Sequence, residues 1–278
     1  MYLLTESVST RSMTGLPRTL FIALAARAQA ARSFPSLDPH DDHAQRLLQA
    51  SGAEVQTSPA DSPTVMNVLW RTQLIKQLGQ EFFEHYPHST GVNLGSGLAH
   101  YFQWLDNGSN RWIDVDLPEV IELRDALIPT PPARCQHKAL DITSAGWWKR
   151  LGLHHHNEPV LLVCEGVLMY LQPAQVRSFL REIGENAPEG SELLCDFISP
   201  VGIGQSALAD TPEHPQAVFT WGAHNGQELA NFHPRLELLS QHSATEALGW
   251  GGSLAEMVWA PLVGGPLYGL AQLRVSDD

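Results

Sequence analysis

The stretch GVNLGSGLAH, residues 91–100, decides the fold, because it ends a buried strand in a glycine-rich turn. Residues 90–96 form a short apolar run, and Gly95 and Gly97 supply a Gly-x-Gly at its end. A dinucleotide-binding fingerprint would place a third glycine three positions after Gly97, where this chain has His100. A glycine turn after a buried strand is typical of a site for a nucleotide-like ligand, but the dinucleotide motif is incomplete here.

Strand and helix patterns alternate after this turn. Further strand-like runs lie at residues 110–116, 134–142, 159–166 and 192–199. Pro118 and Pro173 open two of the intervening helices, since the first position of a helix does not need its N–H. Continuously apolar strands that alternate with helices predict a parallel sheet covered on both faces. The last sixty residues predict a terminal strand pair joined by a loop, with glycines at 249–252 and 264–269 marking loops.

The N-terminal part of the chain predicts helices. Residues from about 15 to 50 read as helical, with Asp41 or Asp42 as the N-cap of the second helix. Residues 65–85 carry a helical apolar stripe. We therefore expect an α/β fold, with a doubly wound, mostly parallel, seven-stranded sheet and a helical N-terminal extension. The expected boundaries are 1–88 for the extension and 89–278 for the core, within one structural domain overall.

Composition disfavours several classes of protein. Thirty acidic against 17 basic side chains give a formal charge of −13, which repels polyanions, so nucleic acid is not an expected partner. The longest nearly apolar run, residues 159–171, is too short to span a bilayer and contains Glu165, so we expect no membrane span. Three cysteines lie in strand-like runs, which indicates reduced, buried thiols and a cytoplasmic protein.

Acidic residues follow the three strands after the glycine turn. Asp116 ends the second strand, where its carboxylate could accept both hydroxyls of a ribose, and Asp141 and Glu165 end the third and fourth. Ligands of open α/β sheets sit beyond these carboxyl ends. Each feature alone could be a plain turn or a helix N-cap. Glu165, however, stands among apolar neighbours, where a carboxylate is costly unless it is paired or solvated in a cleft. Together the four strand ends predict a bound nucleoside.

The missing third glycine favours one type of nucleoside. In NAD-binding proteins that glycine permits close helix–strand packing, and the helix N-terminus receives a pyrophosphate. His100 and the bulky residues YFQWL after it provide poorly for a pyrophosphate. S-adenosylmethionine carries no phosphate and fits the pattern better. An NAD-dependent oxidoreductase remains the alternative enzyme class.

Three motifs, VNLGSGL at 92–98, DVDLPEVIELR at 114–124 and EGVLMYL at 165–171, resemble the leucine carboxyl methyltransferase superfamily. The resemblance is greatest to its bacterial, polyketide-type O-methyltransferases. It extends over nearly the whole chain, through residues 26–47 and FTWGAHNGQEL at 219–229. It implies a class I, S-adenosylmethionine-dependent enzyme that methylates a carboxylate or phenolic hydroxyl of a small, polyketide-like molecule. A non-catalytic relative that keeps the fold is a further alternative.

The resemblance also implies cofactor contacts. Arg71 matches the arginine that binds the methionyl carboxylate of the cofactor, Gly95 and Gly97 would line the cofactor, and Glu165 matches an acid that contacts it. The guanidinium of arginine suits that task, because its fork matches a carboxylate.

Asp116 would accept the ribose hydroxyls, and Asp141 and Ile142 match the acid-plus-apolar pair that holds adenine. The chain departs from the family at residues 99–101, which read Ala-His-Tyr where many members have Asp-Thr-Arg. No catalytic residue, oligomeric state or metal site is predicted, and the histidine run 154–156 is interpreted as a solvated loop.

Overall fold

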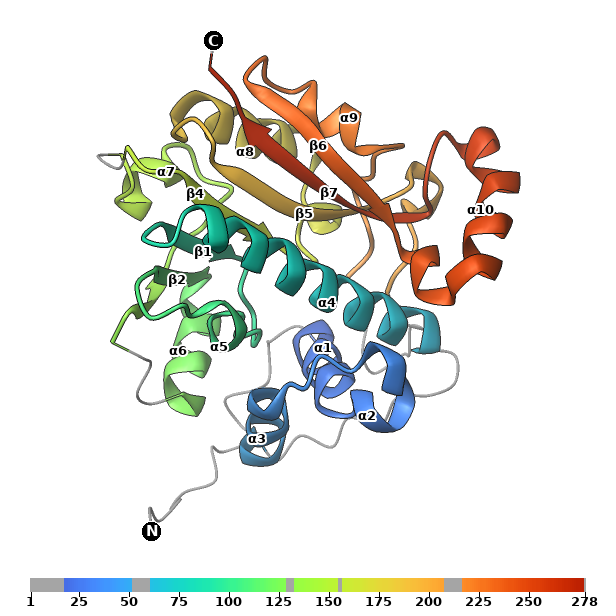
Figure 1. Ribbon diagram of the computed structural model, residues 1–278, viewed down its shortest axis with the longest axis horizontal. Helices are drawn as coiled ribbons and strands as arrows, with labels where there is room; N and C mark the ends of the chain where they lie inside the picture. The colour runs from blue at the N-terminus through green and yellow to red at the C-terminus, as the bar shows by residue number, and fades with distance from the viewer. Residues whose placement is uncertain (1–17, 52–60, 129–132, 155–156, 208–216, 278) are drawn as a thin grey trace.

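A seven-stranded sheet forms the centre of the computed structural model, which describes residues 18–51, 61–128, 133–154, 157–207 and 217–277 (Figure 1). The strands are β1 (Thr90–Leu94), β2 (Arg111–Asp116), β3 (Cys135–Ala139), β4 (Val160–Cys164), β5 (Glu192–Ile198), β6 (Leu236–Ser243) and β7 (Tyr268–Val275). They are ordered β3-β2-β1-β4-β5-β7-β6, and β1 to β5 pair in parallel. β7 pairs antiparallel with both β5 and β6. The predicted doubly wound, mostly parallel sheet is confirmed.

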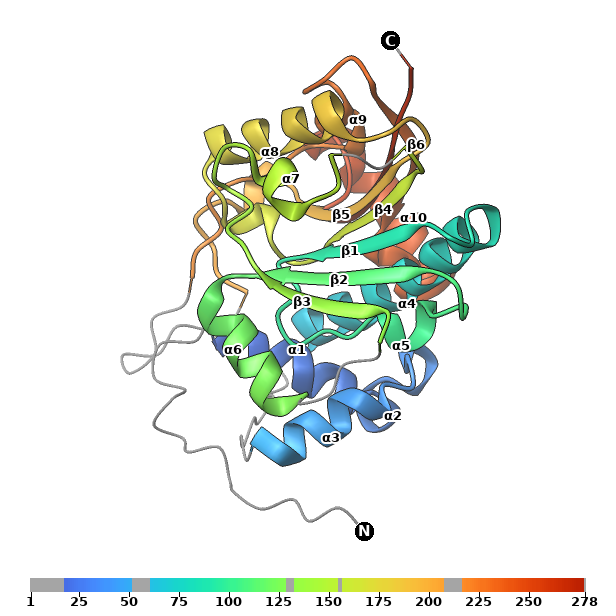
Figure 2. The ribbon, with the colours of Figure 1, turned by 90° about the vertical axis from the view of Figure 1, so that its left-hand side faces the viewer.

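Helices cover both faces of this sheet (Figure 2). One face carries α4 (Ser62–His85), α5 (Phe102–Leu105) and α6 (Pro118–Leu127), and the other carries α7 (Trp147–Leu151), α8 (Pro173–Asn186) and α9 (Gly226–Ala230). The helix α8 illustrates how the spacing of apolar residues predicted a helix. Its apolar residues at positions 176, 179, 180 and 183 are all buried, as their helical spacing predicts. Pro118 and Pro173 lie in the first turn of their helices, as expected.

Among the described residues before α4, the α-helices are α1 (Arg18–Ala28), α2 (Ala30–Ser33) and α3 (Asp42–Ser51). Asp41 is the N-cap of α3, because its carboxylate accepts a hydrogen bond of 2.8 Å from the backbone N–H of Ala44. α1 and α3 share an apolar cluster with Leu98, which follows the glycine turn of β1. The division at residues 88 and 89 stays a prediction, and α4 packs against the sheet.

The C-terminal strand pair is present, but the predicted loop between its strands is wrong. Residues 244–248 form a 3₁₀ turn, and Gly249–Val263 form the helix α10. The glycines at 249–252, expected to mark a loop, begin this helix instead. Gly252 permits close packing, since an added Cβ there would lie 2.1 Å from the carbonyl oxygen of Thr245.

The cysteines are buried and free, as predicted. Within the described ranges, none of the helices combines the length and the apolar character needed to cross a membrane.

Candidate functional site

A cavity opens at the carboxyl ends of β1, β4 and β5. Its walls come from α1 and α4, from the turn at residues 95–99, from residues 165–166 after β4, and from Tyr268 at the start of β7. This is the edge at which the sequence placed its candidate residues. Four of the seven, Arg71, Gly95, Gly97 and Glu165, line the cavity together.

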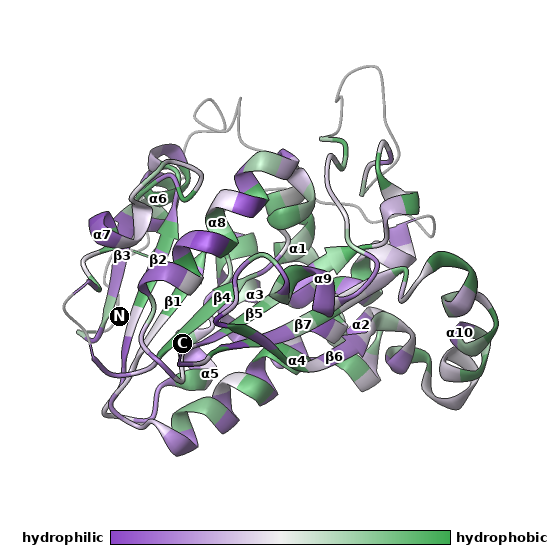
Figure 3. Ribbon diagram, turned by 90° about the horizontal axis from the view of Figure 1, so that it is seen from above, coloured by the Kyte–Doolittle hydropathy of each residue, from purple (hydrophilic) through white to green (hydrophobic). Residues whose placement is uncertain are grey.

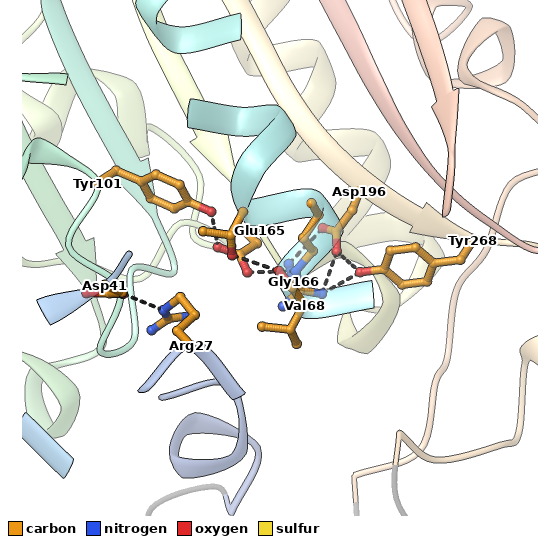
Figure 4. Close-up of polar contacts among 10 residues, drawn as sticks. Arg27, Asp41, Val68, Tyr101, Glu165, Gly166, Asp196 and Tyr268 are labelled. Atoms are coloured by element: carbon orange, nitrogen blue, oxygen red, sulfur yellow. Dashed lines mark hydrogen bonds and ion pairs between the residues drawn. The ribbon is translucent and has the colours of Figure 1, made fainter. Parts of the chain in front are cut away.

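Arg71 of α4 is the centre of the polar contacts in this cavity. Figure 4 labels its partners Glu165, Asp196 and Tyr268. Its Nε donates to Oε1 of Glu165 at 2.6 Å, and its Nη1 donates to Oδ2 of Asp196 at 2.9 Å and to the hydroxyl of Tyr268. The guanidinium therefore bridges two carboxylates from neighbouring strands. Glu165 directly follows β4, and Asp196 lies within β5. Its pKa stays well above the ordinary value: burial alone would lower it, but Tyr268, Glu165 and Asp196 together outweigh burial.

Glu165 is held from two sides. The hydroxyl of Tyr101 donates to its Oε2 at 2.6 Å, opposite the contact from Arg71. Burial would raise the pKa of Glu165, but the charges of Arg71 and Arg27 and the hydrogen bond from Tyr101 lower it below its ordinary value. The pKa of Tyr101 is raised well above its usual range by burial and by Glu165, so its hydroxyl remains a donor.

Asp196 lies deeper, within β5. Its Oδ1 accepts from the backbone N–H of Gly166 at 2.7 Å, and its Oδ2 accepts from Arg71 and from the hydroxyl of Tyr268. Burial raises the pKa of Asp196 even though these contacts favour the ionised form. Asp196 and Tyr268 therefore fix the position of the Arg71 side chain.

A second arginine, Arg27 of α1, also lines the cavity. Its Nε donates to Oδ2 of Asp41 at 3.0 Å, and both side chains are buried. This ion pair joins α1 to α3 at the cavity wall.

The glycine turn is fixed from beneath. Gly95 and Gly97 have φ of +70° and +49°, a region that favours glycine. Nη1 of Arg124 donates to the carbonyl oxygens of Gly97 and Ala99 at 2.8 and 2.7 Å. Ser96 between the glycines has a buried Oγ for which no hydrogen-bond partner exists among the described residues. An unpartnered hydroxyl on a cavity wall is suited to a polar ligand.

The remaining three candidates lie outside the cavity lining. Asp116 accepts from the backbone N–H groups of Gly97 and Leu117, and burial raises its pKa although these two bonds oppose the shift. Asp141 is exposed and caps the following turn through the N–H and hydroxyl of Thr143, while Ile142 is buried in the core. Their assignment to the ribose and the adenine therefore stays a prediction.

Residues 99–101, where the sequence departs from the family, have three different structural roles. Ala99 lines the cavity and Tyr101 holds Glu165. His100 lies outside the cavity lining and stacks on His43 of α3, with ring centroids 4.4 Å apart. His100 is therefore a contact between the N-terminal helices and the glycine turn.

One group beside this turn has ligand atoms close enough for a metal ion: Asp114, Cys135 and His137. Oδ2 of Asp114 already accepts from Nη2 of Arg124 at 2.6 Å, so a guanidinium supplies the positive charge that this carboxylate requires. The histidine run 154–156 falls mostly on residues 155–156, which lie outside the described residues.

Sequence reasoning missed Arg27, Tyr101, Asp196 and Tyr268. Tyr101 had a signal, since it occupies a position where the family has arginine. Asp196 and Tyr268 gave none, because each lies within a strand pattern and meets Arg71 across 125 and 197 positions of sequence.

Comparisons with known proteins identify the family to which this fold belongs. The model of the leucine carboxyl methyltransferase family matches residues 20–184. The tetracenomycin polyketide synthesis O-methyltransferase TcmP of Streptomyces glaucescens is 27% identical over 265 residues, which cover 95% of each chain. The S-adenosyl-L-methionine-dependent methyltransferase dpfgK of Gibberella zeae is 28% identical over 187 residues, 62% of this chain and 61% of that one. A methyltransferase-like crystal structure from Thermobifida fusca superposes with a TM-score of 0.54 at 16% identity, covering 91% of this chain and 94% of that one, and shares the fold.

The fold and these relatives define the class of S-adenosylmethionine-dependent methyltransferases. The chain belongs to the leucine carboxyl methyltransferase family, so the resemblance and the predicted cofactor are confirmed. The alternatives of an NAD-dependent oxidoreductase and a non-catalytic relative are set aside.

Proposed function

We propose that this methyltransferase methylates a carboxylate oxygen of a small, polyketide-like molecule in the cytoplasm. One observation carries the choice of acceptor: the described residues that line the cavity include no histidine, lysine or cysteine. Their one carboxylate, Glu165, is held by Arg71 and Tyr101, and its pKa is lowered. A phenol benefits from a base that removes its proton, whereas a carboxylate is already ionised at neutral pH.

The residues at the cavity fit the cofactor. We assign the methionyl carboxylate to Arg71, whose Nε and Nη1 make its hydrogen bonds to described residues and whose Nη2 is left for a ligand. Ser96 offers the unpartnered hydroxyl, and Gly95 and Gly97 lack side chains that would keep a ligand away from the turn. Asp116 is proposed for the ribose, and Asp141 with Ile142 for the adenine.

The cofactor supplies an activated methyl group on a positively charged sulfur. With the cofactor held by Arg71 and the glycine turn, that methyl group would be available for transfer to the acceptor oxygen, with S-adenosylhomocysteine as the leaving group. The protein contributes orientation and the exclusion of water, because α1 and α4 wall the cavity. Arg71, fixed by Asp196 and Tyr268, holds one end of the ligand in a constant place.

Binding of S-adenosylhomocysteine, measured by calorimetry, tests the cofactor residues. We expect Asp116→Ala to weaken binding by about 1.5–3 kcal/mol, as the loss of charge-assisted hydrogen bonds does. Glu119→Ala is the matched control, since Glu119 is an exposed acid three residues further on. Unchanged affinity in Asp116→Ala would contradict the ribose assignment. Tight binding of NADH without binding of S-adenosylhomocysteine would contradict the enzyme class.

Methyl transfer to paired acceptors tests the choice of carboxylate. We expect aromatic carboxylic acids to be methylated with a rate that does not rise between pH 6 and 9, since the acceptor is ionised throughout this range. The measurement is the transfer of labelled methyl groups to carboxylic acids and to phenols of the same ring system. Methylation of the phenols alone, with a rate that rises with pH, would overturn the proposal.

A further inference from the structure

The helix α10 presents an apolar stripe to solvent. Trp250 is 89% exposed and Leu262 is 83% exposed, and Leu254, Met257 and Val258 between them are also exposed. Their spacing of i, i+4, i+7, i+8 and i+12 puts all five on one face of the helix. Figure 1 shows α10 at the edge of the molecule, and in Figure 3 hydrophobic residues recur along it.

The opposite face of α10 is already occupied. Gly252 is buried against the backbone of Thr245, and the hydroxyl of Thr245 donates to Oε2 of Glu256. Glu256 is the one charged residue in the helix. The exposed stripe is therefore uncharged, although the chain as a whole carries a formal charge of −13. Soluble monomers rarely expose a contiguous apolar patch of this size without a binding role.

We propose that α10 is a dimerisation helix, whose apolar stripe packs against the same stripe of a second copy of this chain. The stripe offers five large apolar side chains, each more than half exposed, for the centre of an interface in which each partner of a stable complex buries roughly 800 Å². Because the stripe is uncharged, two copies meet there without bringing like charges together.

The same charge distribution argues against a lipid surface. Helices that lie on membranes carry lysine and arginine on their polar face, and α10 contains neither. Anionic lipids would also repel a chain with a formal charge of −13. This face therefore fits an uncharged patch on a protein, such as the same stripe of a second copy, and not a bilayer.

In the proposed dimer the two helices cross antiparallel about a two-fold axis. In an isologous contact each copy uses the same residues, and two helices that cross antiparallel reverse their order. Leu254 and Val258, at the middle of the stripe, then lie near the two-fold axis. Trp250 of each copy faces Leu262 of the other.

Sedimentation velocity across a concentration series tests the proposal. We expect a dimer at micromolar concentration, and we expect Leu254→Glu combined with Val258→Glu to raise its dissociation constant by roughly a hundredfold or more. Leu239→Gln is the control, since Leu239 is exposed on β6 and should leave the dimer unchanged. A monomeric wild type, or a dimer that survives the double substitution, would overturn the proposal.

A second measurement does not depend on the folding of that variant. In an equimolar mixture of Leu254→Cys and Val258→Cys variants, a disulfide should join the two chains under a mild oxidant, because position 254 of one copy faces position 258 of the other. The native cysteines are buried, and Leu239→Cys in place of either variant should not cross-link. Absence of this cross-link would overturn the antiparallel contact. Binding of the wild-type monomer to phosphatidylcholine vesicles would show that a bilayer covers the stripe instead.

Discussion

Tyr101 holds the carboxylate of Glu165 in place at the cavity wall. It follows the glycine turn by four positions and donates to Glu165, so that Glu165 is held between a phenol and a guanidinium. This chain has tyrosine where many relatives have arginine, and the hydroxyl supplies a neutral donor in place of a cation. The negative charge of Glu165 is thus balanced chiefly by Arg71.

The substitution Tyr101→Phe tests this role. We expect the free energy of unfolding at pH 7 to fall by about 1.5–3 kcal/mol, because a hydrogen bond to an ionised group is lost. The pKa of Glu165 is lowered in the folded protein, so its contribution is present above the pKa of the unfolded chain and is lost as pH falls through the folded value. The difference between the variant and the wild type should therefore shrink at low pH. Urea unfolding at several pH values measures it.

Tyr170→Phe is the control for that experiment, since Tyr170 also lines the cavity but its hydroxyl has no hydrogen bond to any residue in the described ranges. An equal loss of stability in both variants would contradict a specific contribution from the hydrogen bond between Tyr101 and Glu165.

At the scale of elements, the contact between α3 and the glycine turn is sensitive to pH. Burial and the neighbouring His100 lower the pKa of His43 to about 4, although Asp41 opposes them, and burial also lowers the pKa of His100. Both rings favour the neutral form when folded. Their contribution to stability is therefore complete above about pH 6.5 and is lost as pH falls from there toward 4.

We expect the free energy of unfolding to decrease over that range in the wild type, and to decrease less in His43→Phe. Chemical denaturation at pH 7.5, 6 and 5 measures the slope. His88→Phe is the control, because His88 is exposed. An identical slope in His43→Phe and the wild type would contradict the role of the stacked pair.

The first turn of α10 offers a matched pair of glycines. An added Cβ at Gly251 would meet no atom within 4 Å, whereas one at Gly252 would lie 2.1 Å from the backbone oxygen of Thr245. Gly251→Ala should stabilise the protein by up to about 1 kcal/mol, since alanine favours a helix over glycine. Gly252→Ala should destabilise it, because backbone atoms must shift. Thermal unfolding of the two variants distinguishes these outcomes, and stabilisation by Gly252→Ala would contradict the packing described.

At the scale of the whole molecule, the sequence predicted the sheet well and the site in part. The buried strand β4 is continuously apolar, so its run of apolar residues identifies it without knowledge of its tertiary contacts. The helix α10 was not predicted, because glycines at residues 249–252 are typical of a loop. Gly252 is needed there for close packing against the backbone of Thr245, a contact that the sequence does not reveal. Arg71 and Glu165 were predicted from motifs. Asp196 and Tyr268 could not be, because only the completed sheet brings them to Arg71.

The place of β7 has a consequence for the order of synthesis. β7 lies between β5 and β6, and its first residue, Tyr268, contacts Arg71, so neither the sheet nor the arginine site is complete until residues 268–275 have been made. A chain without β7 holds Asp196 and Arg71 without the hydroxyl of Tyr268 that contacts both. Such a chain leaves β5 and β6 with unpaired edges, which are prone to pair with other chains. Aggregation of the nascent enzyme is therefore favoured until β7 has emerged and paired with both strands.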